Sequence, residues 1–388
     1  MFTLLKNGHI YAPQNLGIMD VLIANDKIAM LGANLNAASF GDNVRVYDLS
    51  GMKVVPGFID QHVHIIGGGG EGGFATRTPE VMLTDLTTAG ITTVVGVLGT
   101  DDITRHMESL LAKARGLEQE GLSAWIYSGS YPIPTPTLTG SIRRDMIVID
   151  KVIGTGEIAM SDHRSSCPTK QQFAELAAEA RVGGILSGKA GVLHIHVGPG
   201  SKRLQWLFEL LEETDLPITQ FTPTHINRTR ELLEEGMKFA KMGGMIDITT
   251  SSQKIAPKRI QPPEAIKLCL ENQVPLDRIT FSSDGNGSMP EFDENNKYCG
   301  LIAASPSSSY KALRTIVQQN TLPLEDALRF VTINPAQSLK LSGKGQLADG
   351  FDADIVVLDE SLEIQHVFAK GACMIQDGTA IVKGTFEK

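Results

Sequence analysis

The 388-residue sequence predicts an α/β fold, a (β/α)8 TIM barrel of parallel strands joined to a small β-sandwich. Two patterns lead to this fold class. Across residues 54–344, apolar Val/Ile/Thr-rich runs alternate with stretches whose apolar residues follow helical spacing. Both ends of the chain contain strand-like runs instead. We therefore expect residues 1–53 and 345–388 to form the β-sandwich domain and residues 54–344 to form the barrel.

Two pairs of strand-like runs account for the predicted β-sandwich. Residues 20–24 and 27–31 are apolar and flank an Asn-Asp pair, which favours a tight turn. Near the other end of the chain, residues 353–358 and 364–369 have the same character. The two ends are similar to each other and differ from the alternating pattern between them.

Eight apolar runs provide the predicted barrel strands, and most are rich in Val, Ile and Thr or apolar throughout, as is typical of buried parallel strands. They cover residues 54–64, 91–97, 122–129, 157–162, 192–198, 217–224, 245–249 and 279–284. Helices are expected between them, at residues 104–120, 171–182, 203–214, 229–242 and 262–273, and from Pro79, with Thr78 as its cap. The third helix has the weakest pattern, because residues 131–150 are rich in Pro and Thr.

Composition argues against several classes of protein. The formal net charge of −9 is unsuited to general nucleic-acid binding, which needs a basic surface. The apolar runs fall short of the roughly 18–20 residues of a membrane span, and the first residues lack the pattern of a secretory signal. Four cysteines without CxxC spacing are expected to be free thiols in a reducing cytoplasm: Cys167, Cys269, Cys299 and Cys373.

Candidate metal ligands occur at five places along the chain, next to predicted strands. Two of them, His62 and His64, end the first strand and point to the same side of it, because they are two residues apart. A lone His-x-His pair is more often structural, but here side chains of ligand type recur at other strands. Together they predict a site for zinc or a similar divalent ion. The candidate ligands are His62, His64, Glu157, His196, His225 and Asp284.

Three other histidines are less suitable as ligands. His194 faces the same side of its predicted strand as His196, and we choose His196 because it lies nearer the carboxyl end. His106 falls on a predicted helix, and His163 lies beyond the end of a strand.

Segments spread over nearly the whole chain follow one family pattern: Pro56–His64, Gly67–Glu71, Arg77–Glu80, Val95–Asp101, Ser161–Arg164, Thr224–Arg228, Ser282–Ser288 and Gly345–Asp354. In these motifs the sequence resembles the amidohydrolase superfamily and, within it, the isoaspartyl dipeptidase family, peptidase family M38. The His-x-His pair is common to the superfamily, whereas the Gly-Gly-Gly-Gly-Glu and Ser-Asp-Gly-Asn-Gly-Ser segments are far more specific.

The resemblance implies two divalent metal ions per subunit, with zinc as the expected metal. The implied reaction is hydrolysis of the β-aspartyl (isoaspartyl) amide bond of dipeptides by a hydroxide that bridges the metals. One metal would be held by His62, His64 and Asp284, and the other by His196 and His225. Asp284 is also implied as the proton shuttle.

One position departs from the family pattern. Better-known members bridge the two metals with a carbamylated lysine on the fourth strand, whereas this chain has Glu157 there, and Lys151 lies outside the predicted strand. Our hypothesis is a site bridged by the two oxygens of Glu157, which needs no carbon dioxide. Because glutamate is shorter than lysine carbamate, the backbone must come closer, and an extra residue at 155–156 would permit this.

The resemblance also implies residues that bind the substrate. Arg164 and Arg228 would each pair with a carboxylate, and Glu71 would hold the ammonium group. With Asp284, Tyr131 and Glu71 complete the implied catalytic set, and the Tyr131 phenol would stabilise the oxyanion. Further hydrogen bonds to the substrate are implied for Gly69, Thr100 and Ser288. These charges suit a dipeptide with two carboxylates and one ammonium.

Other functions stay open at this point. Another amidohydrolase, acting on cyclic amides or N-acyl amino acids, would share the ligands but would not require both arginines and Glu71. A non-catalytic scaffold of the same fold is a third class. The glycines at 67–70 lack the Lys-Ser/Thr of a phosphate-binding loop, so that interpretation is weak. Family resemblance also implies a homo-oligomer, with an octamer as one form, in the cytoplasm.

Overall fold

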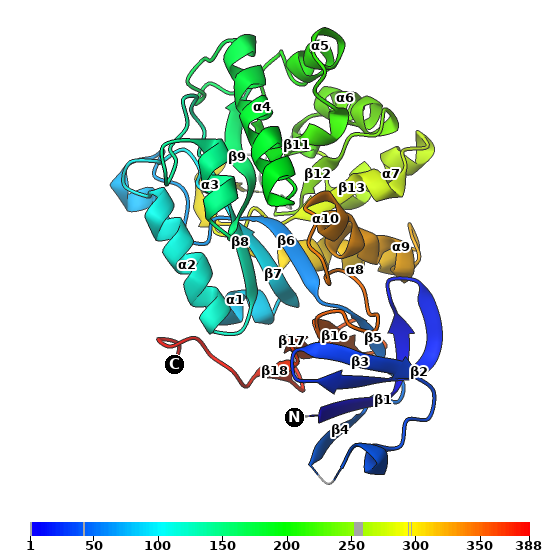
Figure 1. Ribbon diagram of the computed structural model, residues 1–388. Helices are drawn as coiled ribbons and strands as arrows, with labels where there is room; N and C mark the ends of the chain where they lie inside the picture. Colours follow the sequence, from blue (N-terminus) through cyan, green and yellow to red (C-terminus); the bar gives the residue numbers. More distant parts are fainter. Residues whose placement is uncertain (1, 42, 252–258, 294, 296) are drawn as a thin grey trace.

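The computed structural model describes residues 2–41, 43–251, 259–293, 295 and 297–388. The chain has a mixed α/β fold with two parts (Figure 1). One part is a curled parallel sheet covered by helices, and the other is a β-rich sheet that contains segments from both ends of the chain. The strands and helices of the first part position the candidate site.

The β-rich part is a nine-stranded sheet with the strand order β19-β18-β17-β16-β5-β1-β2-β3 and with β4 beside β1. The predicted runs at 20–24 and 27–31 belong to the antiparallel pair β2 and β3, and those at 353–358 and 364–369 to β16 and β17. Its strands are β1 (Phe2–Tyr11), β2 (Asn15–Ala24), β3 (Lys27–Gly32), β4 (Val44–Asp48), β5 (Lys53–Pro56), β16 (Ile355–Leu358), β17 (Ile364–Ala369), β18 (Ala372–Gln376) and β19 (Thr379–Ala380).

The predicted strand at 54–64 is two strands, so that prediction was wrong. β5 pairs with β1 and β16 in the nine-stranded sheet, whereas β6 (Phe58–Val63) pairs with β7 (Ile91–Gly96) in the parallel sheet. The chain crosses between the two sheets at Gly57, where a Cβ atom would lie 2.3 Å from Oγ1 of Thr92. Only glycine fits there, because the backbone passes so close to the neighbouring strand.

The parallel part contains eight strands among the described residues, near the predicted places. Six pair in the order β11-β10-β9-β8-β7-β6, β12 pairs with β13, and a single parallel bridge joins Val63 to Gly285. β9 begins five residues before its predicted start, and β11 follows a short 3-10 turn. The remaining bounds are β8 (Ser123–Ser128), β9 (Val152–Met160), β10 (Val192–Val197), β11 (Phe221–Thr224), β12 (Ile246–Thr249) and β13 (Ile279–Ser282).

Helices follow most of the parallel strands. In α4, Thr169 and Gln172 form a capping box at the start, and Gly188 ends the helix in the left-handed conformation. α1 begins at Leu83, so the start predicted at Pro79 was wrong. The helices are α1 (Leu83–Thr87), α2 (Met107–Gln119), α3 (Ile142–Val148), α4 (Lys170–Ser187), α5 (Gln205–Glu213), α6 (Arg230–Lys241), α7 (Pro262–Glu271), α8 (Ser308–Gln318), α9 (Leu324–Leu328) and α10 (Ile333–Ser338).

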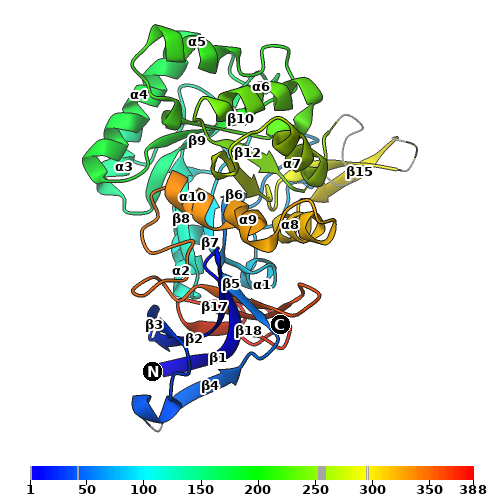
Figure 2. The same cartoon turned by 90° about the vertical axis from the view of Figure 1, so that its right-hand side faces the viewer.

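The segment after β13 was not assigned from the sequence. It forms a hairpin of β14 (Ser288–Phe292) and β15 (Tyr298–Ala303), which extends away from the body of the parallel part (Figure 2). The helices α8, α9 and α10 follow and lie between the parallel strands and the β-rich sheet in both views. No helix among the described residues is long and apolar enough to cross a membrane.

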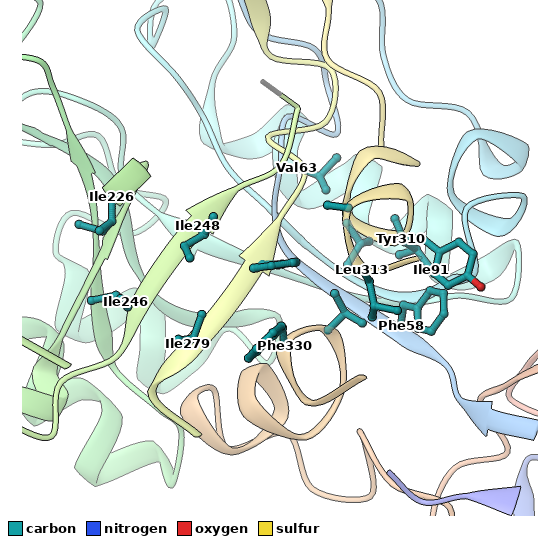
Figure 3. Packing of buried hydrophobic residues seen from close by; sticks show 14 of the residues in the cluster. Phe58, Val63, Ile91, Ile226, Ile246, Ile248, Ile279, Tyr310, Leu313 and Phe330 are labelled. Atoms are coloured by element: carbon teal, nitrogen blue, oxygen red, sulfur yellow. The ribbon is translucent and has the colours of Figure 1, made fainter. Parts of the chain in front are cut away.

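The core of the parallel part is formed by side chains from strands and helices that are far apart in the sequence (Figure 3). Phe58 of β6 stacks on Tyr310 of α8 with ring centroids 5.0 Å apart, and Phe281 of β13 packs against Phe330 at 4.9 Å. Each such side chain contributes about 1.5–3 kcal/mol through burial. All four cysteines are free thiols, as predicted.

A buried lysine connects the two parts of the fold. Lys344 Nζ donates to Ser123 Oγ at the start of β8 over 2.6 Å and to Asp354 Oδ2 over 2.5 Å, and it lies 2.7 Å from Asp352 Oδ2. One buried ammonium therefore compensates carboxylates of the segment that leads into β16.

We predict that Lys344→Met lowers the free energy of unfolding by roughly 3–5 kcal/mol, because it leaves a buried carboxylate without its cation. The midpoint of urea unfolding measures this. Lys27→Met is the matched control, since Lys27 pairs with the same Asp352 but its side chain is 47% exposed. This control should change stability by less than about 1 kcal/mol. Equal effects of the two variants would contradict the prediction.

Candidate functional site

The structure brings all six predicted ligand residues together at the carboxyl ends of the parallel strands, and each is buried. Parallel strands of one sheet end at the same edge, so side chains from distant parts of the sequence meet there. His62 lies on β6 and His64 follows it, Glu157 lies on β9, His196 lies on β10, His225 follows β11, and Asp284 follows β13.

Glu157 is at the centre of this cluster. Its Oε1 atom lies 2.5 Å from His196 Nδ1 and 3.1 Å from His225 Nε2, and its Oε2 atom lies 3.5 Å from His62 Nε2. Burial raises the pKa of this carboxyl group, but the imidazoles of His62 and His196 outweigh burial and hold the pKa well below its usual range. Glu157 is therefore an anion that faces three imidazoles.

Asp284 approaches the same nitrogen of His62 as Glu157 does. Its Oδ1 atom lies 3.1 Å from His64 Nε2 and 3.5 Å from His62 Nε2. Two overlapping groups of potential ligand atoms result, one from His62, His64 and Asp284 and the other from His62, Glu157 and His225. His196 completes the second group through its contact with Glu157.

Several polar atoms of the cluster are buried without a hydrogen-bond partner, namely Nε2 of His62, Nδ1 of His64 and Oε2 of Glu157. Unpaired polar atoms are costly to bury, so the cluster requires a positive charge. Burial opposes a charged His62 imidazolium, yet Glu157 raises the pKa of His62 to about 9. A divalent cation would satisfy Nε2 of His62 and Oε2 of Glu157, and the nitrogen and oxygen donors suit zinc and similar ions. The residues therefore fit a metal.

A β-bulge positions Glu157. Two residues of β9, Gly156 and Glu157, lie opposite the single residue His194 of β10. A Cβ atom on Gly156 would lie 2.5 Å from the carbonyl oxygen of His194, so glycine is needed for this close approach. The bulge puts one residue more on β9 than on β10 at this point, and the Glu157 side chain lies beside the histidines there.

Two of the candidate ligands have an unusual backbone. His225 (φ 62°) and Asp284 (φ 55°) both adopt the left-handed conformation, directly after their strands end. This conformation costs a residue other than glycine roughly 1–3 kcal/mol, and such residues cluster at functional sites. The turn directs both side chains into the cluster rather than along the strand.

His194 supports the cluster from behind. Its Nε2 atom lies 2.8 Å from Nδ1 of His62, and its ring stacks on Tyr127 with centroids 4.8 Å apart. A proton shared between these two nitrogens leaves Nε2 of His62 available as a ligand. The structure thus places His196 beside Glu157 and gives His194 an orienting position. His106 and His163 lie outside the cluster.

Asp162 was missed as a site residue, although it lies in one of the family segments. Its buried carboxylate accepts hydrogen bonds from Nε and Nη2 of Arg164 over 3.0 and 2.8 Å, and its Oδ2 atom lies 2.9 Å from Nε2 of His196. Burial raises the pKa of Asp162, but the bonds from His196 and Arg164 hold it well below its usual range. Asp162 therefore orients a candidate ligand and a cavity arginine together. In the sequence, the one feature that could have indicated Asp162 is its position two residues before the predicted site residue Arg164.

A cavity of about 430 Å³ adjoins the cluster. Two hydrogen bonds meet at Oε1 of Glu71, one from Thr100 Oγ1 over 2.8 Å and one from Arg164 Nη1 over 3.1 Å. Most predicted site residues line this cavity, whereas His62 and His225 lie deeper. The predicted residues in its lining are His64, Gly69, Glu71, Thr100, Tyr131, Glu157, Arg164, His196, Arg228, Asp284 and Ser288.

Tyr131 faces the ligand cluster from the cavity wall. Its hydroxyl oxygen lies 2.7 Å from Nδ1 of His196, and Arg164 lies over its ring, 5.3 Å from the centroid. Burial, together with the charge of Glu157, raises the pKa of this phenol well above its usual value. Tyr131 therefore keeps its proton and can donate a hydrogen bond.

Comparison with known proteins identifies the family. The model of the amidohydrolase family matches residues 53–379, which is most of the chain. The chain belongs to the amidohydrolase family. The superfamily expected from the motifs is therefore confirmed, and this amidohydrolase is a hydrolytic enzyme.

Solved structures give a closer resemblance. A β-aspartyl dipeptidase from Fervidobacterium islandicum AW-1, in complex with the dipeptide β-Asp-Leu, is 46% identical; the match covers 98% of this chain and 97% of that one, with a TM-score of 0.91. A D-hydantoinase from Thermus sp. is 16% identical over 100% of this chain and 98% of that one, with a TM-score of 0.68, and so shares the fold. A dihydroorotase from Lactococcus lactis subsp. lactis is 24% identical, over 94% of this chain and 91% of its own.

We predict that Asp162→Asn weakens the affinity for zinc by about 10–100-fold, because the neutral amide no longer fixes the His196 ring. Zinc retained after dialysis against a series of chelator-buffered solutions measures this. His106→Ala serves as the control, since that side chain is 55% exposed and outside the cluster. An unchanged zinc affinity in the Asp162 variant would remove this residue from the site.

Proposed function

We propose that this amidohydrolase is a metal-dependent dipeptidase that hydrolyses the β-aspartyl (isoaspartyl) amide bond of dipeptides. The observation that carries the proposal is the charge pattern of the cavity, where Glu71, Arg164 and Arg228 surround the ligand cluster. This pattern matches a substrate with two carboxylates and one ammonium. The β-aspartyl dipeptidase bound to β-Asp-Leu, at 46% identity, supports the same substrate class.

The proposal includes the finer architecture. We infer that the eight parallel strands form a closed (β/α)8 TIM barrel within residues 54–344, and that residues 1–53 and 345–388 form a β-sandwich. The bridge between Val63 and Gly285 supports closure, because it joins the end of β6 to the residues that follow β13. The shared nine-stranded sheet supports a domain made from both ends of the chain.

The proposed cofactor is a pair of divalent metal ions, with zinc as the expected metal. His62, His64 and Asp284 would hold one ion, and His196 and His225 would hold the other, with Glu157 between them. When bound, such ions polarise the scissile carbonyl and lower the pKa of water. Two overlapping groups of potential ligand atoms, which share His62 and of which one contains Glu157 and His225, support a pair of sites.

The protein side chains supply the proton transfers and the polar contacts. The Asp284 carboxylate, next to His64, is placed to accept a proton from the attacking water and to deliver it to the departing amine. Water thus provides the hydroxyl of the new carboxylate and the proton of the amine. Tyr131, which keeps its proton, donates a hydrogen bond to the developing oxyanion.

Recognition of the dipeptide depends on charge. Glu71 would hold the α-ammonium, with Thr100 fixing its carboxylate, and Arg164 and Arg228 would bind carboxylates. Further hydrogen bonds are proposed for Ser288 and for the backbone of Gly69, two residues that lie in contact. A Cβ atom on Gly69 would lie 2.7 Å from Cβ of Ser288, so this glycine allows the close approach.

The second candidate is hydrolysis of cyclic amides or N-acyl amino acids. The dihydroorotase and hydantoinase similarities favour it, but at 24% and 16% identity they are more distant than the β-aspartyl dipeptidase. A non-catalytic scaffold would have lost ligand side chains, whereas all six positions here hold a competent group. A homo-oligomer, with an octamer as one form, and a cytoplasmic location remain proposals from the family resemblance.

We expect the purified protein loaded with zinc to hydrolyse β-Asp-Leu at least 100-fold faster than hydantoin, dihydroorotate or N-acetyl-leucine, since only the dipeptide matches all three cavity charges. Initial rates at equal concentrations of enzyme and substrate provide the comparison. Faster turnover of a cyclic amide or of the N-acetyl amino acid would favour the second candidate.

Glu157→Ala should bind fewer than two metals per chain and lose hydrolytic activity, because the anion between the imidazoles is gone. Metal content is measured by elemental analysis after loading with zinc. Glu157→Gln is the matched variant, since it keeps the shape but not the charge. Refolding with and without bicarbonate should give the wild type equal metal content. Two metals and full activity in the alanine variant would refute a glutamate bridge.

A further inference from the structure

Arg164 is already occupied by protein groups. Its Nε and Nη2 atoms donate to Asp162, and its Nη1 atom donates to Glu71 over 3.1 Å. Arg228 makes a longer contact with the protein: its Nη1 atom lies 3.5 Å from Asp162 Oδ2. The cavity therefore needs another cation if it is to hold two carboxylates firmly.

Arg259 lines the same cavity and was not among the predicted site residues. Its Nε and Nη2 atoms are buried and have no hydrogen-bond partner among the residues that the structure describes. Burying guanidinium donors without an acceptor is costly, so their presence points to an acceptor that enters from the cavity. Burial and the nearby Arg228 lower the pKa of Arg259 to about 9, which leaves it charged at neutral pH.

A buried asparagine holds Arg259 next to Arg228. The backbone N–H of Ile260 donates to the carbonyl oxygen of Asn227 over 2.9 Å, and Nδ2 of Asn227 donates to the carbonyl oxygen of Ile260 over 2.9 Å. These two bonds tie the residue after Arg259 to the residue before Arg228. These bonds therefore hold together the chain segments next to the two arginines, and both arginines line the same cavity.

Two guanidinium groups repel each other unless an anion lies between them. A carboxylate is the anion of suitable size and geometry, because its two oxygens accept parallel N–H donors. The described acidic side chains of the cavity have other partners: Asp162 and Glu71 bind Arg164, with Asp162 3.5 Å from Arg228, and Asp284 contacts His64. A substrate with a carboxylate near the scissile bond would fill it.

We propose that Arg259 is a substrate-binding residue, which together with Arg228 binds one carboxylate of the dipeptide. This inference rests on the proposed dipeptidase function and deepens it. Arg164 then serves mainly to position Glu71 and to contact the aspartyl part of the substrate. Arg259 selects for substrates whose carboxylate reaches the loops after β11 and β12.

Three substrates test this proposal: β-Asp-Leu, its C-terminal amide, and the form with an amide in place of the α-carboxylate of the aspartyl part. For Arg259→Ala, kcat/KM on β-Asp-Leu should fall roughly 30-fold or more, the loss typical for removing one partner of a buried charge pair. The amide that lacks the bound carboxylate should show less than about a threefold difference between variant and wild type. That substrate identifies which carboxylate Arg259 binds.

Arg259→Lys keeps the charge but not the paired donors, so it should recover part of the loss on β-Asp-Leu while keeping the same substrate preference. If the alanine variant does not fold, the lysine variant takes its place in the comparison of the three substrates with the wild type. Arg230→Ala is the matched control, since Arg230, at the start of α6 two residues after Arg228, pairs with Glu234, is exposed and is not part of the cavity lining. Zinc content and the midpoint of thermal unfolding should equal those of the wild type in each variant.

Two results would overturn the inference: an unchanged kcat/KM of Arg259→Ala on β-Asp-Leu, or an equal loss on all three substrates, which would indicate a general structural effect. Failure of the proposed function is distinct from both. In that case the wild type itself would hydrolyse none of the three, and the inference would fail with the function on which it rests.

Discussion

The contact of the buried Glu157 carboxylate with the imidazoles of His196, His225 and His62 is the constraint on which the site depends. An anion this deep in the protein is stable only next to positive charge or many donors. The surrounding structure supplies the geometry and leaves part of the charge to a cation. The unpaired Nε2 of His62 and Oε2 of Glu157 belong to groups that could hold a metal ion.

The scaffold tolerates local strain to maintain this contact. A bulge at Gly156 moves Glu157 inward, and the left-handed turns at His225 and Asp284 aim both side chains at the same space. Each feature is unfavourable by itself, and the buried core contributed by the strands and by helices α8–α10 offsets the cost. Three of the candidate ligands thus lie on rigid strands, and His225 and Asp284 lie in short, strained turns.

Pairing of opposite charges continues from the ligand cluster into the wall of the cavity. Asp162 connects the two regions, since one carboxylate contacts His196 of the cluster and Arg164 of the cavity wall. A change at the candidate ligand His196 would therefore reach Arg164 through Asp162. Among the described residues, Nε and Nη2 of Arg259 have no acceptor, and Arg228 approaches Asp162 at 3.5 Å, so that part of the cavity is suited to an anion from outside.

The sequence by itself determined the alternating strands and helices, the sheet shared by the two ends, the six ligand-type residues and the amidohydrolase family, because each depends on local patterns or short motifs. Tertiary structure decided the rest. The break at Gly57 arises from the close approach of Thr92, a neighbour distant in sequence. The roles of Asp162, His194 and Arg259 depend on contacts between different strands and loops, and no local pattern records which buried donors lack a partner.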